Sequence, residues 1–312
     1  MTSRADDEKF MARALEVSRL HAGLTDTNPS VGCVIVKNGE IIAEAVTAIG
    51  GRPHAERQAL EIAGEAARGA TAYVTLEPCA HFGRTPPCAN ALVDFGVARV
   101  VVAVDDPDER VSGRGNQILR DAGIEVETGV LRQESKRALA GYLTRKLKER
   151  PHVILKIAVS ADGMIGRLGG GQVAITGSEA RHAVHLLRAR CDAILVGFGT
   201  AVADDPELTV RISGLEHRSP VRIVMDRRLE LPLGSKLVRT ARDVPVVAVA
   251  GIETDLVSRR EALMAAGVDV LETSSLADLL AVLAERGMSE LLVEGGARVA
   301  KAFLEAGLVD RI

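Results

Sequence analysis

The sequence is poor in aromatic residues: its 312 residues include no tryptophan, two tyrosines and five phenylalanines. Hydrophobic residues nevertheless make up 47% of the chain, so the core must be built from Val, Leu, Ile and Ala. Buried parallel strands of α/β proteins have this composition because helices cover both faces of their sheet. The scarcity also counts against nucleic-acid binding, since unstacked bases pack on aromatic side chains.

Long apolar runs are absent as well. The longest, such as Val31–Val36 and Val100–Val104, have the length of a strand, whereas a membrane helix needs roughly 18–20 apolar residues. The stretch Met1–Lys9 is polar, and no apolar run follows it. We therefore expect no signal peptide, no membrane association and a cytoplasmic location. Four cysteines are too few for a disulfide framework in a chain of this length.

The formal net charge is −3, so no global positive field attracts nucleic acid, and a small-molecule partner is expected. The length favours two domains. A basic helical stretch, Gln133–Arg150, ends before Pro151, and we place the boundary there. The expected domains are residues 1–148 and 149–312.

Helical and strand periodicities alternate along both halves, which predicts an α/β fold. The helices predicted in the first half are Asp6–Leu20, capped by Asp6 or Asp7, His54–Ala67, Cys88–Phe95, Gly115–Ala122 and Gln133–Arg150. The predicted strands there are Val31–Val36, Ile41–Ala45, Ala72–Leu76, Arg99–Val104 and Ile124–Glu127. Asn38-Gly39 predicts a tight hairpin between the first two strands.

The second half repeats the alternation. Its predicted strands are Val153–Val159, Ala193–Val196, Val221–Met225, Val244–Val249 and Glu290–Val293. Its predicted helices are Ser178–Arg190, Leu256–Ala266, Leu276–Arg286 and a last one that follows Gly295-Gly296 and ends at Ala306. Residues 309–312 have the pattern of a strand that is cut short.

Three potential metal ligands stand in the first half: His54, Cys79 and Cys88. One imidazole and two thiolates suit tetrahedral zinc and leave a fourth position for water, whose pKa the metal lowers to roughly 7. Glu56 follows His54 by two residues at the start of the same predicted helix. It can carry the proton of that water to a ring nitrogen and to the leaving ammonia, as hydrolytic deamination requires.

The spacing departs from the usual zinc deaminase pattern, His-x-Glu followed by Pro-Cys-x-x-Cys. Eight residues, not two, separate the cysteines. We expect this inserted loop, residues 80–87, to lie over the metal and shape the substrate pocket, with Arg84 as a candidate substrate-binding residue.

Other interpretations of this motif remain open. His81 can complete a closed structural zinc site, although such a site has no need for Glu56. A deaminase of tRNA or DNA bases with an accessory domain has the same metal pattern, but the acidic charge and the missing aromatic residues count against it. Cys33, inside an apolar strand, and Cys191, between a helix and a strand, are interpreted as structural.

The sequence resembles a known family over about residues 8–312. In the first half the resemblance is carried by Asn-Pro-Ser-Val-Gly at 28–32, Pro-His-Ala-Glu at 53–56 and Thr-Leu-Glu-Pro-Cys-Ala-His-Phe-Gly-Arg-Thr-Pro-Pro-Cys at 75–88. In the second half it is carried by residues 156–163, 192–200, 204–211 and 294–296. These segments are similar to a bifunctional riboflavin biosynthesis family. That family joins a diaminohydroxyphosphoribosylaminopyrimidine deaminase to a 5-amino-6-(5-phosphoribosylamino)uracil reductase.

The resemblance implies a cytidine-deaminase-like N-terminal domain and a dihydrofolate-reductase-like C-terminal domain, with zinc and NADPH as cofactors. The implied substrate is a phosphorylated pyrimidine, and the implied assembly is a homodimer or homotetramer. The cofactor-binding residues that it implies are Val159, Ala174, Thr200, Asp204, Gly295 and Gly296. The substrate-binding residues are Gln172, Arg188, Leu208, Arg211 and Glu294. Many family members have Trp where this chain has Ala174, and family chains usually continue past Ile312, which predicts that the second domain is truncated.

The residue chemistry supports part of this assignment. The guanidinium groups of Arg188 and Arg211 offer forked donors that suit a phosphate. Gly295 and Gly296 let the backbone approach a pyrophosphate at a helix N-terminus. No Gly-x-Gly-x-x-Gly motif follows a strand, so a Rossmann dinucleotide site is not indicated.

Overall fold

The structure, a computed structural model, describes residues 3–82, 86–165, 174–252 and 256–312. By its internal contacts the chain divides into two units, Met1–Lys148 and Glu149–Ile312. Within the described ranges, every helix is too short or too polar to cross a lipid bilayer. All four cysteines are free.

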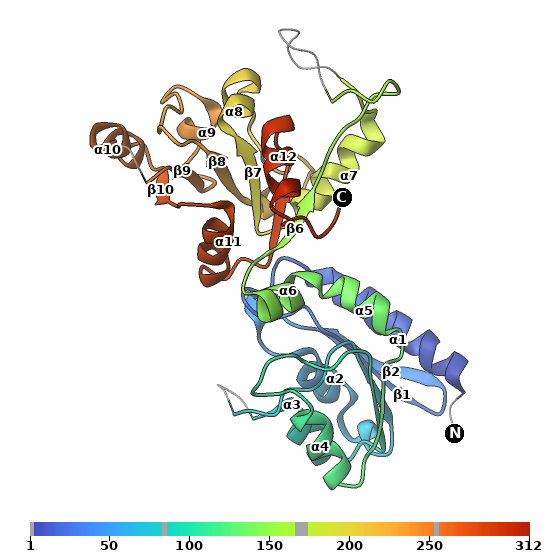
Figure 1. The fold of residues 1–312 in the computed structure, drawn as a ribbon. Helices are drawn as coiled ribbons and strands as arrows, with labels where there is room; N and C mark the ends of the chain where they lie inside the picture. Colours follow the sequence, from blue (N-terminus) through green and yellow to red (C-terminus); the bar gives the residue numbers. More distant parts are fainter. Residues whose placement is uncertain (1–2, 83–85, 166–173, 253–255) are drawn as a thin grey trace. The chain divides into compact units, whose positions relative to one another are not determined.

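The first unit contains a five-stranded sheet with helices on both faces (Figure 1). The strands, in sheet order, are β2 (Glu40–Val46), β1 (Gly32–Lys37), β3 (Thr71–Val74), β4 (Arg99–Val102) and β5 (Glu125–Thr128). β1 is antiparallel to both of its neighbours, whereas β3, β4 and β5 are parallel. The helices are α1 (Arg4–Ser18), α2 (Ala55–Ala63), α3 (Cys88–Asp94), α4 (Arg114–Asp121), α5 (Arg132–Ala138) and α6 (Ala140–Lys148). α1 and α5 lie on one face, and α2, α3 and α4 lie on the other.

The hairpin between β1 and β2 forms as predicted. Asn38 and Gly39 have φ values of 52° and 82°, the left-handed pair that a type I′ turn requires. Lys37 pairs with Glu40 across the turn. Two other predictions need correction: residues 133–150 form two helices separated at Leu139, and α2 ends at Ala63, before a short 3₁₀ turn.

The start of α1 also differs from the prediction. The cap is Ser3, whose hydroxyl accepts a hydrogen bond from the Asp6 amide while the Asp6 carboxylate accepts one from the Ser3 amide. Asp7 is instead buried. Its carboxylate accepts hydrogen bonds from the Tyr73 hydroxyl at 2.8 Å and from both Nη atoms of Arg99 at 2.7 and 2.9 Å. This ion pair links α1 to β3 and β4.

Replacing Asp7 by alanine should lower the free energy of unfolding of the first unit by about 3 kcal/mol, because it removes the carboxylate that pairs with both Nη atoms of the largely buried Arg99 and leaves the exposed carboxylate of Glu125 beside Nε. Both tyrosines, Tyr73 and Tyr142, belong to this unit, so urea unfolding followed by tyrosine fluorescence reports on it selectively. Arg13→Ala is the control. It removes a more exposed pair with Glu44 and should cost at most about 1 kcal/mol. Equal losses for the two variants would contradict the assigned role of Asp7.

The second unit contains a six-stranded parallel sheet. In sheet order its strands are β10 (Asp269–Glu272), β9 (Val246–Ala250), β8 (Val221–Met225), β7 (Ala193–Gly197), β11 (Glu290–Val293) and β6 (His152–Leu155). Its helices are α7 (Ser178–Arg188), α8 (Phe198–Asp204), α9 (Lys236–Arg239), α10 (Val257–Ala265), α11 (Leu276–Glu285) and α12 (Ala297–Glu305). Side chains of α8, α9 and α10 build the core on one face of the sheet, and those of α11 and α12 build it on the other.

Several elements of this unit differ from the prediction. The strand predicted over 153–159 ends at Leu155, and residues 309–312 contribute only a single bridge, between Arg311 and Ile154. Helices α8 and α9 and the edge strand β10 were not predicted. α8 contains Gly199, a poor helix former, α9 has only four residues, and β10 has no buried residue to produce an apolar pattern.

The strand order creates a topological switch point in this unit. β11, the last strand in the chain, lies between β7 and β6, so the connections that leave β7 and β11 run in different directions across the sheet. Ligands of open α/β sheets bind at such a switch point, beyond the carboxyl ends of the strands. Thr200 and Glu294–Gly296 follow these two strands directly.

Candidate active sites

Three side chains converge where helices α2 and α3 begin. His54 is the N-cap of α2, Cys88 is the first residue of α3, and Cys79 lies in the segment after β3. The Nδ1 atom of His54 lies 3.7 Å from the Cys79 sulfur and 3.4 Å from the Cys88 sulfur, and all three ligand atoms lie within 4.8 Å of one another. Tetrahedral zinc with ordinary bond lengths separates its nitrogen and sulfur ligands by about 3.5 Å. This donor set therefore fits a zinc ion.

Glu56 lies in the first turn of α2, two residues after His54, and is 3% exposed. Burial raises the pKa of its carboxyl group to about 7. A hydrogen bond with the Cys88 side chain lowers the pKa of Cys79 to about 4, which favours the thiolate form that binds metals. The site thus combines a metal-type donor set with a carboxyl group that can hold or release a proton near neutral pH.

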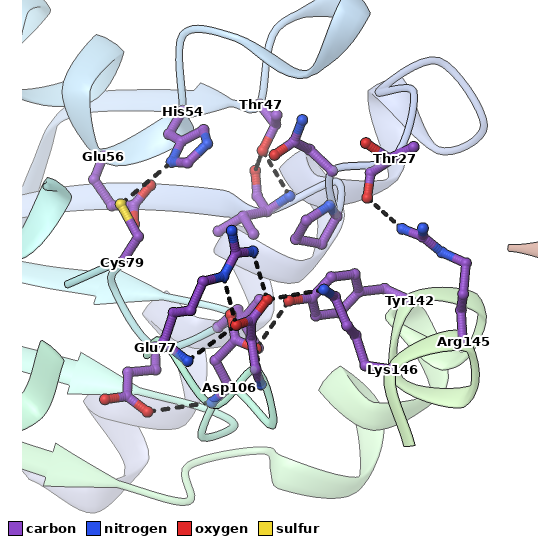
Figure 2. A pocket seen from close by; sticks show the side chains of 16 residues that line it. Thr27, Thr47, His54, Glu56, Glu77, Cys79, Asp106, Tyr142, Arg145 and Lys146 are labelled. Carbon is purple, nitrogen blue, oxygen red and sulfur yellow. Dashed lines mark hydrogen bonds and ion pairs between the residues drawn. The ribbon is translucent and has the colours of Figure 1, made fainter. Parts of the chain in front are cut away.

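His54, Glu56 and Cys79 line a cavity of about 290 Å³. Its lining is mostly polar and includes Thr27, Asn28, Pro29, Thr47, Asp106, Asp108, Arg110, Tyr142, Arg145 and Lys146. Figure 2 shows His54, Glu56 and Cys79 on one side and the side chains from α6 on the other. A small, polar molecule is the kind of ligand that this cavity suits.

The residue before Pro78 and Cys79 is held by backbone groups. The buried carboxylate of Glu77 accepts hydrogen bonds from the amides of Asp106, Gly113 and Asn116, at 3.0 to 3.2 Å. α4 approaches so closely that a Cβ atom on Gly115 would lie 2.0 Å from the Pro78 carbonyl oxygen. Glu77 and Gly115 therefore fix the segment that carries Cys79.

The cavity wall includes acidic residues that the sequence interpretation missed. The Asp106 carboxylate accepts a hydrogen bond from the Tyr142 hydroxyl at 2.9 Å. Asp108 accepts from the Arg110 side chain and from Lys146 Nζ, and these cations lower its pKa. The sequence did contain a signal for these aspartates. They follow β4, and β3, which is parallel to β4, leads into the segment of Cys79. The ends of the two strands therefore meet at the same edge of the sheet.

The second unit brings several predicted residues together near the carboxyl ends of β7 and β11. The Arg188 guanidinium makes a two-pronged ion pair with Glu294, at 2.8 and 3.0 Å, and donates to the Thr209 carbonyl at 3.1 Å. Leu208 is buried. The Arg211 amide donates to His185 Nδ1, while the Arg211 side chain is 56% exposed and pairs with Glu207 at 3.3 Å. Arg188 is thus committed to Glu294, and Arg211 is the more accessible cation.

Only some of the predicted cofactor residues lie close to one another. The Gly296 amide donates to the Thr200 hydroxyl at 3.2 Å, so these two residues are neighbours. Asp204, Val159 and Ala174 are exposed. Asp204 lies one turn after Thr200 on α8, whereas among the described residues no recorded contact joins Val159 or Ala174 to this pair. The predicted residues Arg84 and Gln172 lie outside the described residues.

Comparison with known proteins assigns a class to each unit. Residues 4–104 match the cytidine and deoxycytidylate deaminase zinc-binding region, and residues 151–312 match the RibD C-terminal domain. Fold and site therefore define a zinc-binding deaminase domain joined to a RibD-type reductase domain, as predicted.

Relatives over nearly the whole chain identify the family. The riboflavin biosynthesis protein RibD of Aquifex aeolicus is 43% identical over 311 residues, covering 99% of this chain and 86% of the relative. RibD of Escherichia coli is 40% identical over 320 residues, with 98% and 86% covered. The chain belongs to the RibD family of riboflavin biosynthesis proteins.

Solved structures agree with this assignment. A RibD structure from Acinetobacter baumannii (form 2) is 41% identical and superposes with a TM-score of 0.88, covering 99% of this chain and 86% of that one. A diaminohydroxyphosphoribosylaminopyrimidine deaminase/5-amino-6-(5-phosphoribosylamino)uracil reductase from Thermotoga maritima is 37% identical, with a TM-score of 0.85 and coverage of 97% and 84%. The α/β fold class predicted from the sequence is confirmed.

Proposed function

We propose that the protein catalyses two successive steps of riboflavin biosynthesis. The first unit deaminates 2,5-diamino-6-ribosylamino-4(3H)-pyrimidinone 5′-phosphate, and the second unit reduces the ribosyl chain of the product to ribityl with NADPH. The observation that carries the first step is the convergence of His54, Cys79 and Cys88 beside a cavity that His54, Cys79 and the buried carboxyl group of Glu56 line. Membership of the RibD family supports both steps.

In the deaminase site, His54, Cys79 and Cys88 would hold zinc. A zinc ion bound there supplies an activated water near neutral pH. Glu56 would accept one proton from the attacking water and pass it to the pyrimidine ring nitrogen. It would then accept a second proton from the hydroxyl group added to the ring and give it to the departing amine, and its pKa of about 7 suits both directions of transfer. Asp106, Asp108 and the cations of α6 would surround the polar remainder of the substrate.

In the reductase, NADPH would supply the hydride and would lie beyond the carboxyl ends of β7 and β11, next to Thr200 and Gly296. The close approach there suits a cofactor that contacts the backbone: a Cβ atom on Gly295 would lie 2.7 Å from Val299, and one on Gly296 would lie 3.2 Å from the Thr200 hydroxyl. The packing of Val299 and Thr200 therefore favours glycine at both positions. The missing side chains also leave the start of α12 open to a phosphate. Val159, Ala174 and Asp204 are the further proposed contacts.

The phosphorylated substrate would lie beside Leu208, Arg211 and Glu294, with Gln172 and Arg84 as proposed contacts of the reductase and deaminase sites. We assign the phosphate to Arg211 rather than to Arg188, because the Arg188 guanidinium is already paired with Glu294. Arg188 would act by fixing that carboxylate and the Thr209 carbonyl.

Replacing Arg211 by alanine should therefore weaken the apparent affinity for the phosphorylated reductase substrate by roughly ten- to hundredfold, the effect of losing a charge-assisted contact. Arg211→Lys should recover only part of the loss, since lysine lacks the fork. NADPH affinity and ammonia release should not change. The measurement is reductase kinetics with phosphorylated and dephosphorylated substrate. An equal loss with both substrates would rule out Arg211 as the phosphate anchor.

We also propose a homodimer or homotetramer in the cytoplasm, as the family resemblance implies. Light scattering coupled to size-exclusion chromatography tests the assembly, and cell fractionation tests the location.

One experiment tests the proposed function as a whole. The protein is incubated with the diaminopyrimidine ribosyl-phosphate, with and without NADPH, while ammonia release and NADPH absorbance are followed separately. We expect ammonia in both reactions and NADPH oxidation only after ammonia release. Deamination of a tRNA or DNA substrate in place of the pyrimidine would support the base-editing alternative.

A further inference from the structure

A single arginine lies fully buried in the sheet of the second unit. Arg222 belongs to the central strand β8 and has an exposed fraction of 0%. Burial lowers its pKa to about 10, so the guanidinium remains charged at neutral pH. A buried cation is costly unless it is well paired, and an apolar side chain of similar volume is often more stable at such a position. The stability of the core alone therefore does not explain why an arginine stands at this position.

Among the described residues, Arg222 donates to uncharged oxygen atoms. Nη1 donates to the Glu207 carbonyl at 3.1 Å and to the Thr240 hydroxyl at 2.8 Å. Nη2 donates to the Thr240 carbonyl at 2.9 Å and to the Val244 carbonyl. Nε is buried without a partner among the described residues. The guanidinium thus joins the segment before Arg211 to the end of α9 and to the approach to β9.

The segment that receives this hydrogen bond, Asp205–Arg211, has an irregular backbone. Asp205 and Leu208 have φ values of 38° and 56°, in the left-handed region where a non-glycine residue is strained and persists only if its surroundings hold it. The Lys236 amide donates to the Asp205 carboxylate at 2.8 Å. The carbonyls of Glu207 and Thr209 are held by Arg222 and Arg188.

The same segment carries two residues of the proposed reductase site, Leu208 and Arg211. The position of the Arg211 side chain therefore depends on contacts made several residues earlier. Arg222 itself faces the core that contains Leu208, Leu237 and Val238, and its guanidinium is fully covered. It can influence bound substrate only through the backbone that it holds.

We propose that Arg222 is a positioning residue of the reductase: by holding the Glu207 carbonyl from within the sheet, it fixes the path of Asp205–Arg211 and thereby the placement of Arg211 toward the substrate phosphate. This inference rests on the proposed reductase function. It assigns to Arg222 an effect on substrate binding, and none on the deaminase.

The test compares Arg222→Met, which keeps the approximate volume and removes the donors, with Arg222→Lys, which keeps one donor group. Both are made in the full chain. For Arg222→Met we expect the KM for the phosphorylated reductase substrate to rise about ten- to hundredfold, with a smaller change in kcat, as for other losses of positioning contacts. Arg222→Lys should be intermediate. Ammonia release should stay at the parent rate.

Leu279→Ala serves as the matched stability control. Leu279 is fully buried in the core on the other face of the same sheet, so its truncation should lower Tm without disturbing Asp205–Arg211. We expect its reductase KM to stay within about twofold of the parent value, because it removes no contact to the site. A reductase KM unchanged in both Arg222 variants, at any loss of Tm, would overturn the proposal.

Hydrogen exchange separates this inference from the proposed function. In Arg222→Met, and not in Leu279→Ala, the amides of the peptide covering 205–212 should exchange about tenfold faster, since their segment opens more readily. If the parent chain reduces no substrate, the proposed function fails, and the exchange measurement alone decides whether Arg222 holds this segment. Unchanged exchange in Arg222→Met overturns the positioning role. Arg222→Lys supplies the same comparison if Arg222→Met does not fold.

Discussion

Replacing Glu56 by glutamine should lower the rate of ammonia release by roughly 10²-fold or more, the scale of a lost general acid–base group. Glutamine has nearly the same size and hydrogen-bonding shape but cannot carry a proton. Because Glu56 is not one of the three metal-type ligands, zinc content should remain at the parent level. Elemental analysis measures the zinc, and steady-state ammonia release measures the reaction.

Glu61→Gln is the matched control for this variant. Glu61 lies on the same helix, α2, but its side chain is 53% exposed and pairs with Arg57 on the surface. It should deaminate at the parent rate. If Glu56→Gln also deaminates at nearly the parent rate, Glu56 is not the proton carrier. If it loses zinc, the residue has a role in holding the metal that the geometry does not indicate.

Cys79→Ser should remove the metal and abolish ammonia release. The parent protein should contain about one zinc per chain, held by three protein ligands and a water, and a neutral serine hydroxyl is a poor substitute for a thiolate. All the residues assigned to reduction lie beyond position 149, so reduction of already deaminated substrate should continue. Zinc analysis and separate assays of the two reactions check both halves of this prediction.

Cys33→Ala provides the comparison for Cys79→Ser. Cys33 is buried in β1 and is not part of the metal-type group, so its replacement should leave zinc and ammonia release in place. Full zinc content and parent activity in Cys79→Ser would contradict the ligand assignment. Loss of both activities in a folded Cys79→Ser protein would instead indicate one composite site.

Much of the deaminase prediction rested on residues that are close together in the sequence. His54 and Glu56 stand two residues apart at a helix start, and Pro78-Cys79 and Pro87-Cys88 mark the turns that present the thiols. These are short-range patterns, so they can be recognised without a fold. The hairpin at Asn38-Gly39 was predictable for the same reason, since its turn type depends on two adjacent residues.

The remaining parts of the sites depend on long-range contacts. Asp108 meets Lys146 across 38 residues, and Arg188 meets Glu294 across 106. No local sequence pattern indicates either of these pairings. The arginine at 222 is a clearer case. It lies within an apolar strand, and its acceptors, three backbone carbonyls and the Thr240 hydroxyl, belong to segments that no local pattern brings near.

The sequence by itself determined the α/β class, the hairpin and the three metal-type ligands with their neighbouring carboxyl group, because each depends on local spacing or periodicity. Only the tertiary structure decided which charges are already paired, and so which remain available to a substrate. It committed Arg188 to Glu294, left the Arg211 side chain exposed, and brought Asp106 and Tyr142 into the cavity of the metal-type ligands. The physical reason is that pairing and burial depend on distances between segments, which parallel strands and their crossovers set only when the chain is folded.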